Sequence, residues 1–96
     1  MRRLDFARAA LADLDAIYRH SLTEFGEAQA DHYAGMIDAA FQLLAEFPEA
    51  GVLVPDRVDG LRRRNVGAHA ILYQALTNRV RIVRLLHQRM DPNRHL

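Results

Sequence analysis

The chain has 96 residues, half of them apolar, so it can close one hydrophobic core but leaves no room for a second domain. It contains no cysteine, which excludes disulfides, thiolate zinc sites and thiol nucleophiles. No apolar run approaches the length of a signal-peptide core or a membrane span. We therefore expect one domain over residues 1–96, in the cytoplasm and with no membrane partner.

Charge is distributed unevenly along the chain. Residues 1–60 carry five arginines and eleven acidic residues, a formal charge of −6. Residues 61–96 carry eight arginines against Asp91 alone, a formal charge of +7. All basic residues are arginine, partly a matter of composition, yet guanidinium groups also bind carboxylates and phosphates through paired hydrogen bonds. The basic C-terminal third indicates a surface that grips a macromolecule rather than a pocket that converts a metabolite.

The N-terminal half predicts a short strand at residues 4–6 followed by a helical hairpin. From Ala7 to Gly26 apolar residues recur at three- and four-residue steps, and Gly26 suits the end of a helix. A second helix begins at Glu27 and stops at Pro48. The two predicted core stripes are Leu11, Leu14, Tyr18, Leu22 and Phe25, then Ala30, Tyr33, Ile37, Phe41, Leu44 and Phe47.

The C-terminal half predicts a loop and then a sheet. Glycine, proline and aspartate break any period over residues 48–60. Three strands follow at residues 61–66, 70–76 and 80–87, joined by tight turns into an antiparallel meander. The tail from Gln88 is polar, and we expect it to be extended or weakly ordered. The order of elements predicts an α+β fold.

The last strand predicts a partner site because both of its faces carry apolar groups. Strict alternation places Val80, Ile82, Arg84 and Leu86 on one face and Arg81, Val83, Leu85 and His87 on the other. Two helices cover only one face of a sheet, so we expect the other face to await a partner. In the alternative, loop 48–60 or the tail covers it.

Arg84 is the natural anion-binding candidate, because its apolar neighbours Ile82 and Leu86 would desolvate it and leave it in need of an acceptor. The alternative is an internal ion pair or a side chain that extends to solvent. His87 could serve as a general base beside the arginines, or it could simply be a polar residue ending a strand. The histidines show no paired metal spacing, and we expect no metal and no cofactor.

Several segments, in this order and spacing, give the sequence its resemblance to a known family. They are residues 12–18 (ADLDAIY), Phe25-Gly26 with Gln29-Ala30, residues 47–51 (FPEAG), Gly60-Leu61-Arg62-Arg63 with Val66-Gly67, residues 71–73 (ILY) and residues 83–91 (VRLLHQRMD). Over nearly its whole length the chain resembles the ParE toxins of the RelE/ParE toxin-antitoxin superfamily.

The resemblance implies a toxin that is neutralised by a small ParD-like antitoxin and that poisons DNA gyrase without being an enzyme, with DNA contacted only through the antitoxin or gyrase. Antitoxin contacts are then expected at Tyr18, Arg63, Tyr73, Ile82, Arg84 and Leu86. Target contacts are expected in the tail region, at His87, Arg89, Asp91 and Arg94. RelE-like relatives instead cut mRNA on the ribosome, and the residues that would keep this alternative open are Arg63, Arg84 and His87. The chain has no lysine, no tyrosine after Tyr73 and no glutamate after Glu49, so most acid-base residues of the nucleases have no counterpart.

Overall fold

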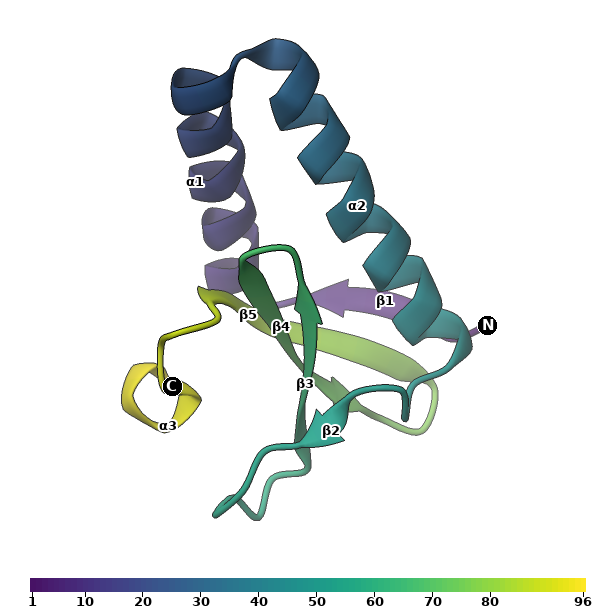
Figure 1. Cartoon of the computed structure of the whole chain (residues 1–96). Helices are drawn as coiled ribbons and strands as arrows, with labels where there is room; N and C mark the ends of the chain where they lie inside the picture. The colour runs from purple at the N-terminus through teal and green to yellow at the C-terminus, as the bar shows by residue number, and fades with distance from the viewer.

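The computed structural model describes all residues 1–96 and places two long helices on one face of a five-stranded sheet (Figure 1). The elements are β1 (Arg3–Phe6), α1 (Arg8–Phe25), α2 (Glu27–Glu46), β2 (Val52–Leu53), β3 (Leu61–Val66), β4 (His69–Ala75), β5 (Arg79–His87) and α3 (Pro92–His95). The strand order is β1-β5-β4-β3-β2. β1 runs parallel to β5, and the other neighbours are antiparallel. The α+β fold, the N-terminal strand and the meander are confirmed, whereas β2 and α3 were not predicted.

Gly26 forms the corner of the helical hairpin, as its position predicted. It has φ 85°, and its N–H donates to the carbonyl of Leu22. A positive φ of this kind is costly for residues with a Cβ, so glycine is the natural residue here. α2 ends at Glu46, just before Pro48. Neither long helix is apolar enough over its length to cross a membrane.

The first core lies between the helices and the sheet. Tyr73, Val80 and Ile82 are fully buried there, and Phe6 meets Phe41 edge to face with ring centroids 5.1 Å apart. Its members are Ala10, Ile37, Phe41, Leu44, Ile71, Tyr73, Val80, Ile82 and Leu85. Four residues of the predicted stripes do not join this core: Leu11, Leu22, Phe25 and Phe47 are 53%, 42%, 67% and 56% exposed. Phe25 is the last residue of α1, and Phe47 follows the last residue of α2.

A bulge in β5 changes which side chains face the helices. Tyr73 pairs with Ile82, whereas its neighbour Leu72 pairs with Arg84, so Val83 is the extra residue. An extra residue shifts the alternation beyond it. Leu85 therefore joins the first core, and Leu86 lies on the opposite side. The prediction that Ile82 and Leu86 share a face is wrong.

The second face of the sheet has its own small core, formed by Val54, Leu61, Leu72 and Leu86. Val54 comes from loop 48–60, and its N–H donates to the carbonyl of Leu61 at 2.9 Å. Met90 of the tail packs against the same cluster. The expectation that this part of the face is open to a partner is therefore wrong, and the alternative, in which the loop and the tail cover it, is confirmed.

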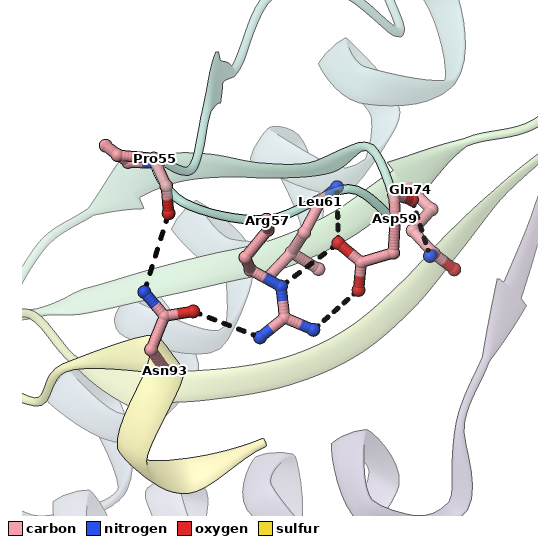
Figure 2. Close-up of polar contacts among 6 residues, drawn as sticks. All are labelled: Pro55, Arg57, Asp59, Leu61, Gln74 and Asn93. Atoms are coloured by element: carbon pink, nitrogen blue, oxygen red, sulfur yellow. Dashed lines mark hydrogen bonds and ion pairs between the residues drawn. The ribbon is translucent and has the colours of Figure 1, made fainter.

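The tail folds back onto the loop rather than extending. Asp91 caps α3 by accepting from the N–H of Asn93, and Pro92 is buried. Figure 2 shows the Asn93 amide between Arg57 and the carbonyl of Pro55, and Arg57 held in turn by both carboxylate oxygens of Asp59. This pairing lowers the pKa of Asp59 to about 2, chiefly through the hydrogen bond from Arg57. The prediction of a weakly ordered tail is corrected, because the tail has partners in loop 48–60.

Candidate partner-binding site

A mainly apolar groove of about 380 Å³ lies between α1 and α2. Tyr18 lines it, and its hydroxyl donates to Asp31 across the hairpin at 2.6 Å. That hydrogen bond is the main cause of the raised pKa of Tyr18. The apolar lining is Leu14, Ile17, Ala30, Ala34, Ile37 and Phe41, with the carboxylates of Asp15 and Asp38 also in the lining. The groove thus offers an apolar floor with negative charge, a surface suited to an amphipathic segment.

A second hollow, of about 410 Å³, gathers three histidines beside the hairpin: His20, His69 and His87. The rings of His69 and His87 are 5.9 Å apart, centroid to centroid. The Tyr33 hydroxyl is 2.7 Å from Nδ1 of His69. Burial lowers the pKa of His69 first, and the nearby His87 and His20 lower it further. No three histidine, aspartate or glutamate side chains lie close enough together to hold a metal ion.

Arg84 is occupied by an internal partner. Its Nε and Nη2 donate to the two carboxylate oxygens of Asp13 at 2.7 and 3.0 Å, and its Nη1 donates to the carbonyl of His95 at 3.2 Å. The carboxylate raises the pKa of the guanidinium. The need for an acceptor was predicted correctly, and the alternative of an internal ion pair is the one observed.

The residues of the nuclease alternative are only partly brought together. Arg84 and His87 line one shallow hollow with His69. Arg63 lines different hollows, beside Val52, and donates to Asn65 at 3.0 Å and to the carbonyl of Gln88 at 2.8 Å. Both arginines are thus already hydrogen-bonded within the chain.

Three of the predicted antitoxin contacts lie in the core. Tyr73 and Ile82 are 0% exposed, and Leu86 is 3% exposed. The Tyr73 hydroxyl accepts from the N–H of Gly51 at 2.7 Å and donates to the carbonyl of Pro48 at 2.8 Å. Burial is the main cause of the raised pKa of Tyr73. These residues support the surface from beneath and present no side chain to a partner in this conformation.

The predicted target contacts are more accessible. The side chains of His87, Arg89 and Arg94 are exposed, while Asp91 serves as the cap of α3. Nδ1 of His87 accepts from the N–H of Arg89 at 3.2 Å. Sequence reasoning placed Tyr18 and the edges of the hairpin in the antitoxin site, and Tyr18 does line the groove. It could not give the width of the groove, because periodicity marks apolar stripes but not how far apart the two helices stand.

Comparisons with known proteins agree with this architecture. The family model described as the ParE toxin of the type II toxin-antitoxin system parDE matches residues 4–92. Toxin ParE1 of Caulobacter vibrioides is 36% identical over 96 residues, covering 100% of this chain and 99% of that protein. Toxin ParE1 of Mycobacterium tuberculosis is 32% identical over 89 residues, covering 92% and 91% of the two chains.

Two solved structures share the fold. The chromosomal ParDE TA system from P. aeruginosa aligns with a TM-score of 0.76 at 26% identity, over 91% of this chain and 96% of that one. The toxin-antitoxin complex RelBE2 of Mycobacterium tuberculosis aligns with a TM-score of 0.67 at 21% identity, over 91% and 98%. The architecture is that of the RelE/ParE superfamily. Within it, this chain belongs to the ParE toxin family of type II toxin-antitoxin systems, which confirms the resemblance seen in the sequence.

Proposed function

We propose that this toxin inhibits DNA gyrase in the cytoplasm, needs no cofactor, and is held inactive by a ParD-like antitoxin. The proposal is supported by its similarity to curated ParE1 toxins over nearly their whole length and by the ParDE system among its structural neighbours. The observation that favours binding over catalysis is the ion pair between Arg84 and Asp13.

Cleavage of RNA through its own 2'-hydroxyl requires a base, an acid and free cations for the phosphate charge. Arginine supplies only the cation, since it does not release its proton. Here Arg84 would first have to leave Asp13, and Arg63 would have to leave Asn65 and the carbonyl of Gln88. Tyr73 is buried and hydrogen-bonded on both sides, so it is not available as an acid or base.

The groove between α1 and α2 is the proposed binding site of the antitoxin. We expected from the sequence that acidic and apolar antitoxin residues would cover the sheet face bearing Arg84 and the edges of the hairpin. The chain's own loop and tail cover the part of that face around Leu61, Leu72 and Leu86, so the groove is the better site. Its carboxylates, Asp15 and Asp38, favour an amphipathic segment with basic residues flanking its apolar side.

One observation favours the nuclease alternative. His87 is not isolated, because His69 lies beside it in the same hollow. A pair of imidazoles could supply both a base and an acid, which a single histidine on the strand could not do as effectively.

The deciding experiment adds purified toxin to two assays in parallel. In the first, gyrase supercoils relaxed plasmid, and trapped cleaved DNA is scored. In the second, ribosomes translate a defined mRNA, and breaks are mapped. The proposal predicts loss of supercoiling or trapping of cleaved DNA, with the mRNA intact. Codon-dependent mRNA cleavage that His87→Ala or His69→Ala abolishes, with gyrase unaffected, would establish the alternative.

A further inference from the structure

The face of the sheet opposite the helices carries a cluster of arginines where β1 lies beside β5. Arg3 pairs with Arg79 and Asp5 pairs with Arg81 in the parallel register. The alternating residues Leu4, Phe6, Val80 and Ile82 contribute to the first core on the helix side. Arg3, Asp5, Arg79 and Arg81 therefore project from the other side. We call these four residues the arginine face.

The arginine face has more positive charge than its single carboxylate can balance. Asp5 lies 3.3 Å from Nε of Arg79 and 2.9 Å from Nη1 of Arg81. Nε of Arg79 is buried, yet it lacks a well-aligned acceptor despite that short distance. The side chains of Arg79 and Arg81 remain 36% and 38% exposed, and Arg3 is exposed. Arg79 and Arg81 thus share one carboxylate, and with the exposed Arg3 the face carries three positive charges against one negative charge.

The composition of the arginine face favours the phosphate backbone of a nucleic acid over a protein segment as its partner. Protein interfaces gain most of their affinity from apolar and aromatic anchors. Here the apolar residues that alternate with the arginines, Leu4, Phe6, Val80 and Ile82, belong to or pack against the first core instead. Arginine binds phosphate through paired hydrogen bonds. The arginine face contains no aromatic side chain for base stacking, which disfavours single-stranded nucleic acid.

We propose that the arginine face binds the phosphate backbone of duplex DNA without reading its sequence. From the sequence we expected DNA contacts only through the antitoxin or gyrase, and this contact would be direct. Asp5 holds Arg79 and Arg81 side by side when the face is empty, and it opposes an incoming phosphate by its like charge. The proposal does not depend on gyrase inhibition, because the contact is between the toxin and DNA alone.

The experiment measures binding of the purified toxin, without antitoxin or gyrase, to a short fluorescent duplex of arbitrary sequence over a range of salt concentrations. Three phosphate contacts predict a slope of log affinity against log salt of about −2.7. Arg79→Gln/Arg81→Gln should reduce the magnitude of this slope by about 2. The matched control is Arg8→Gln/Arg19→Gln, which removes the same charge from exposed positions on α1 and should leave the slope unchanged.

Two single variants separate charge from folding. Arg3→Gln removes an exposed side chain and should reduce the slope by about 1 without lowering Tm. Asp5→Asn keeps a hydrogen-bond acceptor, removes the opposing charge and should tighten duplex binding about threefold. An unchanged slope in Arg79→Gln/Arg81→Gln, an equal loss in the control, or equal competition by a glutamate peptide of the same charge would overturn the proposal. Weaker binding by Asp5→Asn at unchanged Tm would also overturn it.

Discussion

Asp13 of α1 accepts hydrogen bonds from Arg84 and from the backbone N–H of Leu85, so one carboxylate joins the first helix to an inner strand of the sheet. The side chains of Asp13 and Arg84 are only 16% and 26% exposed. Removing one partner of such a pair leaves a charge with little solvent to compensate it. The connection therefore stabilises the packing of the hairpin on the sheet.

We predict that Asp13→Ala lowers the free energy of unfolding by about 2–3 kcal/mol, since it strands the guanidinium and one backbone donor. Asp15→Ala, two residues further along α1, is the matched control. Asp15 pairs with Arg19 on the surface, and their side chains are 63% and 78% exposed. Its loss should stay below about 0.5 kcal/mol. Urea unfolding of the two variants checks the prediction, and equal losses would contradict it.

Tyr33 fixes the turn between β3 and β4 to the second helix. Its hydroxyl accepts from the N–H of Ala68 at 3.0 Å and contacts His69 and the carbonyl of Val66. Gly67 lies under the ring with φ 55°, and a Cβ there would meet the ring of Tyr33. Gly67→Ala should therefore destabilise the fold by about 1–3 kcal/mol through strain and overlap.

The control for this turn is Gly35→Ala in α2, where an added Cβ meets nothing within 4 Å. Alanine is the better helix former, so this variant should be more stable than the parent chain by up to about 1 kcal/mol. Thermal unfolding of both variants gives opposite shifts if Gly67 is required for its conformation. An unchanged melting temperature in Gly67→Ala would show that the turn adapts to the added methyl group.

We predict that the folded chain loses stability in mild acid because of His69. Its pKa is lowered in the folded chain, chiefly by burial, so the unfolded chain binds the proton more readily. The contribution of the neutral ring is complete above the unfolded pKa of about 6.5 and is lost as pH falls through the lower folded pKa. Urea midpoints measured between pH 7.5 and 5 should fall less in His69→Gln than in the parent chain. His32→Gln, at an exposed position of α2, should retain the full pH dependence.

The helices and the meander could be predicted because their signals are local: apolar spacing, Gly26 at the corner and turn residues between strands. The bulge at Val83 could not, since alternation is the default for a strand and the extra residue is fixed by pairing with β4. The acceptor of Arg84 was out of reach of local patterns too. The sequence indicated that Arg84 needs an acceptor, but its partner Asp13 lies 71 residues away in the sequence.

The sequence of the tail contains a helix-start signal that the prediction of an extended or weakly ordered tail did not use. Asp91 followed by Pro92 is a typical helix start, with a capping carboxylate before a proline in the first turn. What no local pattern could show is the partner that holds this helix, because Asn93 binds Arg57 from the loop before β3.

The groove predicts which surface the antitoxin occupies. Ala34 lines the groove, whereas Ala39 is also exposed on α2 but does not line it. Ala34→Arg should fill the groove and weaken antitoxin binding at least about tenfold, since it replaces a small side chain at an apolar interface. Ala39→Arg adds the same side chain elsewhere and should bind normally. Each toxin variant is co-expressed with the antitoxin, and cell growth is measured. If the antitoxin protects cells from Ala34→Arg as well as from Ala39→Arg, the groove is not its binding site.

The tail supports a final prediction about the toxin's target. We expected from the sequence that deletion of residues 89–96 would reduce toxicity more than stability. The structure assigns the tail a part in folding, since Met90 packs on the second core, Pro92 is buried and Asn93 binds Arg57. Deletion should therefore lower stability by about 2 kcal/mol or more, and its effect on growth would report folding as well as target binding.

Side-chain substitutions separate these roles. Arg89 and Arg94 are exposed, and only their backbones take part in the hydrogen bonds of the tail. Arg89→Ala/Arg94→Ala should keep Tm within about 2 °C of the parent chain, because surface changes of this kind cost little. If the tail contacts the target, the same variant should lose growth inhibition and gyrase inhibition while still binding the antitoxin. Asn93→Ala provides the comparison, since it should lower Tm without removing charge. Full toxicity of Arg89→Ala/Arg94→Ala would place the target contacts elsewhere on the molecule.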